Sequence, residues 1–220
     1  MWLGIDTTTE RLGLALVNPD DGTSYPVTDM VYRDMAMRLH PELKKLMAQA
    51  KVTPSQLTGI AVTRGPGSYT GMRLGLAAAQ GLALVAGTPL VGVNAQAVVA
   101  RPHLGQGRPV CVVSRANAGD VYLAVVDTTG TPTQQTDLVP IADMVAHIPP
   151  HALVVGTAAA LLEGNIPNGV DVLLDEESAY PNPVQLIHTA RALHAEGADA
   201  PASPLYLHAL TYRKSPGLKT

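Results

Sequence analysis

The chain of 220 residues has no phenylalanine, and aromatic residues make up only 4% of it. Its single cysteine, Cys111, excludes an internal disulfide and a cysteine-built zinc site and favours a reducing cytoplasm. Charged residues reach 15%, below the ~25% typical of soluble domains, so much of the surface must be neutral or covered. The net charge of −3 argues against autonomous binding of a polyanion, because phosphate contacts need clustered cations.

Hydrophobic residues, in contrast, make up 46% of the chain, which is enough for a sizeable core. Residues 74–100 contain no charged side chain, but a Gly-Thr-Pro turn at 87–89 leaves each part too short to cross ~30 Å of hydrocarbon. The first residues carry Asp6, Glu10 and Arg11 and lack the basic segment of a secretory signal. We therefore expect a soluble, cytoplasmic protein without membrane contact.

The order of apolar runs and turn signals in the first half predicts a β-β-β-α-β-α-β series. This order is typical of an α/β, ribonuclease H-like layer with a mixed sheet. The predicted strands are residues 1–7, 11–17, 25–32, 59–63 and 90–93, and the predicted helices are residues 41–50 and 70–86.

The second half repeats this order in a weaker and shorter form. Paired strands are expected at 110–114 and 121–127, a strand at 152–156, and helices at 157–162 and 183–196. We therefore predict an N-terminal lobe (1–100), a reduced C-terminal lobe (101–209) and a tail (210–220).

The most informative motif is the glycine-rich loop RGPGSYTGMRLG at residues 64–75, between a strand and a helix. Free N–H groups at such a place can hold an anion, but a tight turn with positive φ at glycine explains the same residues. The motif is neither a Walker A loop nor a dinucleotide fingerprint. Arg73 opposes the helix dipole, which predicts an acidic partner nearby. The candidate positions are Gly65, Gly67, Ser68, Thr70 and Arg73.

A second candidate site follows the first strand. The segment Asp6-Thr7-Thr8 is similar to the acidic phosphate loop of actin-like ATPases and sugar kinases, in which an acid organises Mg²⁺ through water. Thr8 stands where that loop usually has glycine, which crowds a phosphate. Asp6 is therefore either a degenerate phosphate-loop acid or a cap for the N–H groups of its own turn.

The helix predicted at 70–86 has small residues at every fourth position, Gly71, Gly75 and Ala79, and is apolar nearly all round. Such a helix is expected to be buried on all sides, against its own sheet and against another helix. We predict that it forms a protein interface together with the helix at 41–50. The predicted interface residues are His40, Leu43, Leu46, Met47, Gly71, Met72, Gly75, Leu76 and Ala79.

Catalytic patterns are not legible in the sequence. There is no G-x-S-x-G nucleophile motif, and prolines at 149 and 150 break the helix that would align His147 with His151. We expect no catalytic residue, no metal site and no cofactor.

The stretches MWLGIDTTTERLGLAL, RLHPELKKLM and AVTRGPGSYTGMRLGLAAAQGLAL together resemble the TsaB (YeaZ) family. The resemblance covers residues 1–95 and returns at 119–122 and 204–207. It implies an actin-like fold of two lobes and a non-catalytic role in tRNA threonylcarbamoyladenosine synthesis. It also implies a TsaD-like catalytic partner, a TsaE-like ATPase, a homodimer when the chain is alone, and tRNA contact only through the complex.

Two rival functions belong to other classes. A small actin-like kinase similar to pantothenate kinase shares an opening strand that ends in Asp6, but it would need a glycine after that residue. A peptidase would need a nucleophile geometry that the sequence lacks.

Overall fold

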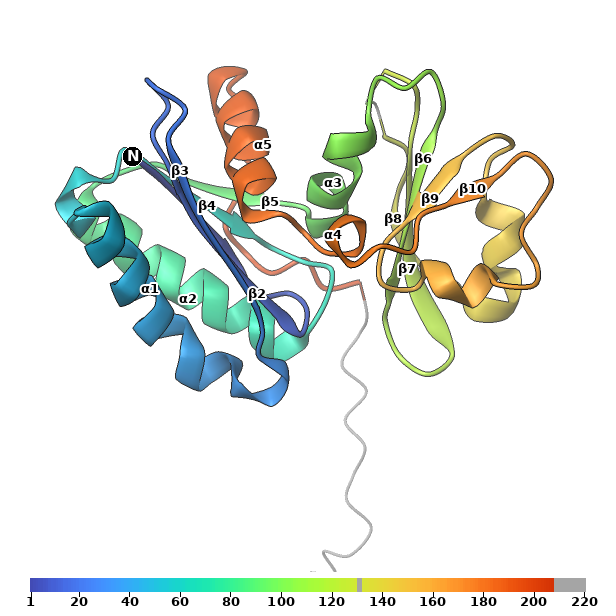
Figure 1. Ribbon diagram of the computed structural model, residues 1–220, viewed down its shortest axis with the longest axis horizontal. Coiled ribbons are helices and arrows are strands. Elements are labelled where there is room, and N and C mark those ends of the chain that lie inside the picture. Colours follow the sequence, from blue (N-terminus) through green and yellow to red (C-terminus); the bar gives the residue numbers. More distant parts are fainter. Residues whose placement is uncertain (130–131, 208–220) are drawn as a thin grey trace, which may run out of the picture.

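The computed structural model describes residues 1–129 and 132–207, which form two lobes built on separate five-stranded sheets (Figure 1). The first sheet has the order β3-β2-β1-β4-β5. Its first three strands are antiparallel neighbours, whereas β4 and β5 run parallel to β1. The strands are β1 (Trp2–Asp6), β2 (Arg11–Val17), β3 (Ser24–Met30), β4 (Gly59–Thr63) and β5 (Leu90–Val93).

The second sheet repeats this pattern in the order β10-β9-β6-β7-β8. Three antiparallel strands are again followed by two parallel ones. Short 3₁₀ helices, η4 (Ile141–His147) and η5 (Ala159–Leu162), stand where the first lobe has α-helices. The strands are β6 (Val110–Arg115), β7 (Asp120–Val126), β8 (Pro132–Pro140), β9 (Leu153–Val155) and β10 (Asp171–Val172). The α/β fold of ribonuclease H-like, actin-like type, with a reduced second lobe, is thus confirmed.

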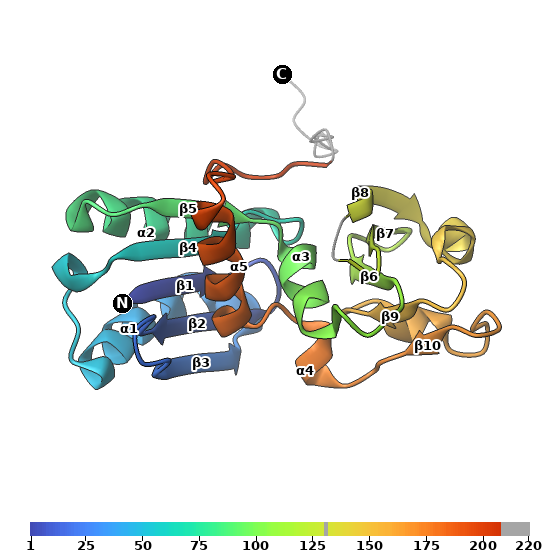
Figure 2. The same ribbon diagram turned by 90° about the horizontal axis from the view of Figure 1, so that it is seen from above.

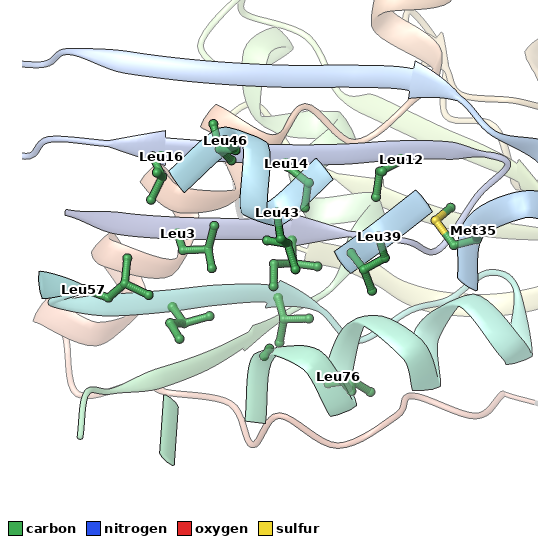
Figure 3. Close-up of a cluster of buried hydrophobic side chains, with 14 of the residues drawn as sticks. Leu3, Leu12, Leu14, Leu16, Met35, Leu39, Leu43, Leu46, Leu57 and Leu76 are labelled. Atoms are coloured by element: carbon green, nitrogen blue, oxygen red, sulfur yellow. The ribbon is translucent and has the colours of Figure 1, made fainter. Parts of the chain in front are cut away.

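The first sheet is covered on both faces (Figure 2). Helices α1 (Met35–Ala50) and α2 (Tyr69–Ala86) lie on one face, where leucines from the strands and both helices form a buried cluster (Figure 3). Helix α5 (Pro183–Ala195) lies on the other face, where Leu186, Ile187 and Ala190 are fully buried. Coverage on both faces explains why β1 and β4 are buried along their whole length and are apolar except for their last residues.

Helix α5 returns to the first lobe although its residues fall in the range predicted for the second. It packs against β1 and β2, and a Cβ on Gly4 of β1 would lie 2.7 Å from the carbonyl oxygen of Pro183. The segment after it stays there, because the Gly92 N–H in β5 donates to the Ala200 carbonyl at 3.1 Å. The predicted range 101–209 therefore does not form one packing unit. The predicted tail, 210–220, lies outside the described residues.

Helix α1 begins earlier than the sequence predicts, at Met35 instead of Pro41. Proline is usually tolerated only in the first turn, because it lacks the N–H that would bond to the carbonyl four residues earlier. Here that carbonyl belongs to Met37, whose side chain is 69% exposed, so this part of the helix faces water. Water can then hydrate the carbonyl, and the helix continues through Pro41.

A short helix that the sequence does not predict joins the two lobes. Helix α3 (Ala95–Ala100) follows β5 directly, and the side chain of Asn94 caps it by accepting from Gln96 N–H at 2.8 Å. With six residues it is too short to give a readable periodicity. The sequence also does not predict the short α-helix α4 (Glu176–Ala179). None of the helices in the described ranges has the length and apolar character needed to span a membrane.

Candidate functional site

A cleft of about 620 Å³ opens between the two lobes. The first lobe contributes the loop after β1 and the start of α2, and the second contributes the turn after β6. Most polar groups that face the cleft are hydroxyls and amides. Among the described lining residues, Glu10 and Arg115 carry the formal charges. The polar residues of the wall are Thr8, Thr9, Ser68, Ser114, Asn117 and Thr157.

Asp6 lies behind this wall and does not line the cleft. Its side chain is 1% exposed, and Oδ1 accepts from the Thr8 N–H at 3.2 Å, the Thr8 hydroxyl at 2.7 Å and the Thr63 hydroxyl at 2.5 Å. Burial raises the pKa of Asp6 above its usual value of 3.8, and the hydrogen bonds from Thr63 and Thr8 partly oppose that shift. This carboxyl group therefore holds its own turn together, the second of the two interpretations left open by the sequence.

The loop after β1 and the glycine-rich loop touch each other directly. The Ser68 N–H donates to the Thr8 carbonyl at 2.7 Å, and the Thr7 hydroxyl donates to the Gly71 carbonyl at 2.7 Å. A Cβ on Gly71 would lie 1.9 Å from the Thr7 carbonyl oxygen, and one on Gly67 would lie 2.2 Å from that of Thr8. Glycine at these positions therefore permits a backbone contact that no larger residue allows.

At the start of α2, part of the hydrogen-bonding capacity of the free backbone N–H groups is used within the chain itself. The Ser68 hydroxyl accepts from the Gly71 N–H at 3.1 Å and so caps the helix. Gly65 and Gly67 have φ values of +104° and +151°, as the tight-turn interpretation requires. Thr70 is exposed beside them.

Arg73 contacts an aromatic ring and not the predicted acid. Its guanidinium lies 5.2 Å from the centre of the Tyr69 ring, and Nη1 donates to the Tyr69 hydroxyl at 3.1 Å. No ion pair to a carboxylate is formed by Arg73 within the described residues. The ring of Tyr206 lies on Tyr69 with 5.3 Å between centres. The expected acidic partner was therefore wrong.

Most residues predicted for a protein interface lie inside the chain's own core. Gly75 faces Thr7, because a Cβ there would be 2.3 Å from the Thr7 hydroxyl oxygen. The groove predicted along the small residues is thus filled by β1 and the turn after it, and the expectation that α2 is buried on all sides was wrong. The buried members are Leu43, Leu46, Gly71, Met72, Gly75, Leu76 and Ala79; Met47 is half-buried, and His40 is exposed.

Sequence reasoning missed the contacts that come from distant segments. Glu10 accepts from the Tyr180 hydroxyl at 2.8 Å, and Tyr206 reaches the cleft from the far end of the described chain. Glu10 and Tyr180 are 170 positions apart, and Tyr69 and Tyr206 are 137 positions apart. No local spacing in the sequence predicts contacts over such distances. Residues 1–129 and 132–207 bring together no group of three His, Cys, Asp or Glu side chains suited to a metal ion.

Comparison with known proteins gives the same fold and a family. The model of the tRNA N6-adenosine threonylcarbamoyltransferase (TsaD) family matches residues 29–165. The tRNA threonylcarbamoyladenosine biosynthesis protein TsaB of Escherichia coli (strain K12) is 34% identical over 124 residues, 56% of this chain and 53% of that protein. A tRNA N6-adenosine threonylcarbamoyltransferase of Lawsonia intracellularis is 41% identical over 106 residues, 42% of this chain and 30% of that enzyme.

A crystal structure from Pseudomonas aeruginosa, of an uncharacterized protein with similarity to the peptidase YEAZ, has a TM-score of 0.77 and 25% identity to this chain. The structural match covers 94% of this chain and 99% of the Pseudomonas aeruginosa chain. The chain belongs to the TsaD family of proteins and, within it, to the TsaB (YeaZ) branch. By sequence it matches about half the length of its TsaB relative.

The glycine contacts predict opposite effects at two positions of α2. Gly71→Ala should destabilise the fold by about 1–3 kcal/mol, because the new methyl group overlaps the Thr7 carbonyl. Gly81→Ala is the matched control, since a Cβ there meets nothing within 4 Å, and it should stabilise the helix by about 1 kcal/mol. Urea unfolding of both variants measures these changes. Equal effects at the two positions would contradict the contact.

The raised pKa of Asp6 predicts a dependence on pH. A carboxyl whose pKa is higher in the folded state contributes most to stability below its usual pKa of 3.8, and that contribution is lost as the pH rises. As the pH rises above about 4, the free energy of unfolding of Asp6→Asn should therefore increase relative to that of the parent.

Asp21→Asn is the control with the opposite sign. The Thr23 backbone N–H lowers the pKa of Asp21, so its contribution is present at neutral pH and lost towards acid. The free energy of unfolding of the parent should increase relative to that of this variant as the pH rises. Parallel pH profiles for both variants would show that burial does not govern Asp6.

Proposed function

We propose that this chain serves the biosynthesis of threonylcarbamoyladenosine in tRNA as a non-catalytic subunit. It binds a TsaD-like threonylcarbamoyltransferase and activates it, together with a TsaE-like ATPase. The base modified by that complex is the adenosine next to the anticodon, and tRNA contacts this chain only within the complex.

The family supports the pathway. Relatives named for threonylcarbamoyladenosine biosynthesis and for the transferase itself both resemble part of this chain. A chain related to the catalytic subunit shares its fold and is therefore suited to pair with it in a pseudo-symmetric manner. The matches span only part of those relatives, and we therefore propose the partners of this chain from the family as a whole.

The contact between the two loops carries the non-catalytic part of the proposal. A phosphate bound by the loop after β1 would need the space and the N–H groups that the chain uses itself. The Ser68 N–H already donates to the Thr8 carbonyl. Asp6, the acid that precedes the loop after β1, is buried and accepts hydrogen bonds from Thr8 and Thr63. The side of the cleft that would take a phosphate is therefore closed by hydrogen bonds of the protein itself.

The outer surface of α2 supports docking of a partner. Leu84 and Val85 are 85% and 70% exposed, and Ala77 and Gly81 are exposed on the preceding turns. Arg73 is the one charged residue of the 18 in this helix. An apolar helix surface of this kind is typical of a protein interface. We place the docking surface on Ala77, Gly81, Leu84 and Val85, towards the C-terminal end of α2, and not on the glycines that face β1.

A charge on this surface should abolish docking without unfolding the chain. Leu84→Lys should weaken association with a TsaD-like partner by roughly tenfold or more, because the ammonium group would be desolvated at the interface. Leu174→Lys is the matched control: Leu174 is also an exposed leucine, at 52%, but belongs to the second lobe. Isothermal titration with the partner and thermal melting of both variants measure the effect.

Three outcomes are distinguishable. Loss of association for Leu84→Lys alone, with both melts unchanged, supports the docking surface. Equal association of both variants removes α2 from the interface. If neither variant nor the parent associates, a TsaD-like protein is not the partner. Sedimentation of the chain alone shows whether the same surface forms a homodimer.

The isolated chain should bind neither ATP with Mg²⁺ at micromolar affinity nor tRNA at submicromolar affinity. The closed loops oppose the first and the net charge of −3 opposes the second. Arg213, Lys214 and Lys219, the cations nearest the C-terminus, are too few to change this and lie outside the described residues. Calorimetry with ATP would favour the kinase alternative if it detected tight binding. Gel retardation with tRNA tests the second point.

A further inference from the structure

An Asn-Gly pair lies at the tip of an exposed turn in the second lobe. Asn168-Gly169 is the one Asn-Gly sequence in the 220 residues, and both residues are exposed. The Val170 N–H donates to the Pro167 carbonyl at 3.1 Å, which closes the turn, and Gly169 has φ +78°. A glycine with positive φ at the third position defines a type II turn.

The groups that would react are free of competing bonds. Within the described parts of the chain, neither the Asn168 side-chain amide nor the Gly169 N–H makes a hydrogen bond. Because glycine has no side chain, its nitrogen can approach the carbonyl carbon of the preceding asparagine side chain without steric hindrance. Asn117, an asparagine in another turn, is bonded in contrast: its Oδ1 accepts from the N–H groups of Gly119 and Asp120 at 2.8 and 3.0 Å.

A histidine lies directly beside the glycine of this pair. A Cβ built on Gly169 would lie 2.8 Å from Nδ1 of His151, so the imidazole covers that side of the glycine. His151 itself has φ +59°, an uncommon conformation for a residue with a side chain, and this conformation places it next to the turn. The three heavy atoms nearest to that built position all belong to this imidazole, and imidazole is the most common general base in proteins.

We propose that Asn168-Gly169 is a self-modification site at which the chain converts an asparagine into an aspartyl or isoaspartyl residue, assisted by His151. The Gly169 nitrogen forms a bond to Cγ of Asn168 and loses its proton to His151. The Asn168 amide leaves as ammonia with a proton returned by the imidazole, and a cyclic imide remains. Water then opens the imide at either carbonyl, so the net reaction consumes one water and releases one ammonia.

The modification has a structural consequence at the edge of the second sheet. Opening of the imide towards isoaspartate adds one methylene group to the backbone immediately before Gly169. The next residue, Val170, is buried in the core of the second lobe, and Asp171 pairs with Leu153 and forms an ion pair with Arg108. The longer backbone cannot keep both the turn and this register, so β10 should detach from β9 in the modified chain.

The test follows the full-length chain during prolonged incubation at neutral pH by peptide mass spectrometry and by assay of released ammonia. We expect Asn168 to acquire the mass of aspartate and to separate into two isomeric peptides. Asn165, three residues earlier in the same exposed loop but followed by Ile166, is the internal control and should stay unchanged. Conversion of Asn165 at the rate of Asn168, or no conversion of Asn168, would overturn the proposal.

Two variants test the part played by the imidazole. His151→Asn keeps a residue that tolerates positive φ and should slow the conversion by roughly tenfold. His147→Asn, an exposed histidine of η4, should leave the rate unchanged. Thermal melting shows that each variant is folded before incubation. Equal rates for the parent and both variants would show that His151 takes no part, and an unchanged melting temperature after full conversion would refute the detachment of β10.

Discussion

The first lobe depends on one close approach, that of the Thr7-Thr8 backbone to the glycines before and within α2. Gly67, Gly71 and Gly75 each leave room for nothing larger than hydrogen at this place. The contact fixes where α2 begins relative to β1, and hydrogen bonds from Thr7 and Ser68 hold it. Asp6 secures the same turn from the inside through Thr8 and Thr63. A motif that suggests anion binding by its composition is therefore used for packing between two loops of the chain.

The second constraint is the short helix between the lobes, because both cores share it. Val98 of α3 packs with α5 and the first sheet, whereas Val99 and Ala100 pack with the second sheet. The Gln96 side chain, 2% exposed, donates through Nε2 to the carbonyls of Val112 and Tyr122 at 3.2 and 2.9 Å. Opening the lobes would either break these bonds or expose the apolar surface of Val98, and both are costly. The packing of α3 on both cores therefore opposes separation of the lobes.

The sequence predicts the elements of the first lobe well because each carries a local signal. Apolar runs give β1, β4 and β5, and the spacing of Leu43, Leu46 and Ala50 gives the last turns of α1. It predicts only part of the site. Thr8, Gly67 and Ser68 do line the cleft, but the second lobe and Tyr206 contribute residues from distant positions, and no local pattern encodes such contacts. The predicted start of α1 was wrong because proline is most often found in the first turn of a helix, whereas Pro41 lies inside this one. The packing of α5 on the first lobe depends on tertiary contacts, which the composition of the helix does not predict.

The stripe of small residues in α2 shows why burial and interface are difficult to separate from sequence. Gly71, Gly75 and Ala79 have the spacing of a helix–helix contact, and they do permit a close approach, but the approaching group is the turn after β1. Periodicity reports which face of a helix is buried, not what buries it. The informative residues are Leu84 and Val85, which are apolar and yet stay exposed, whereas Leu82, Ala83 and Ala86 beside them pack against the core. Nothing in residues 1–129 and 132–207 covers these two side chains, which is why the proposed docking surface lies on them and not on the stripe of small residues.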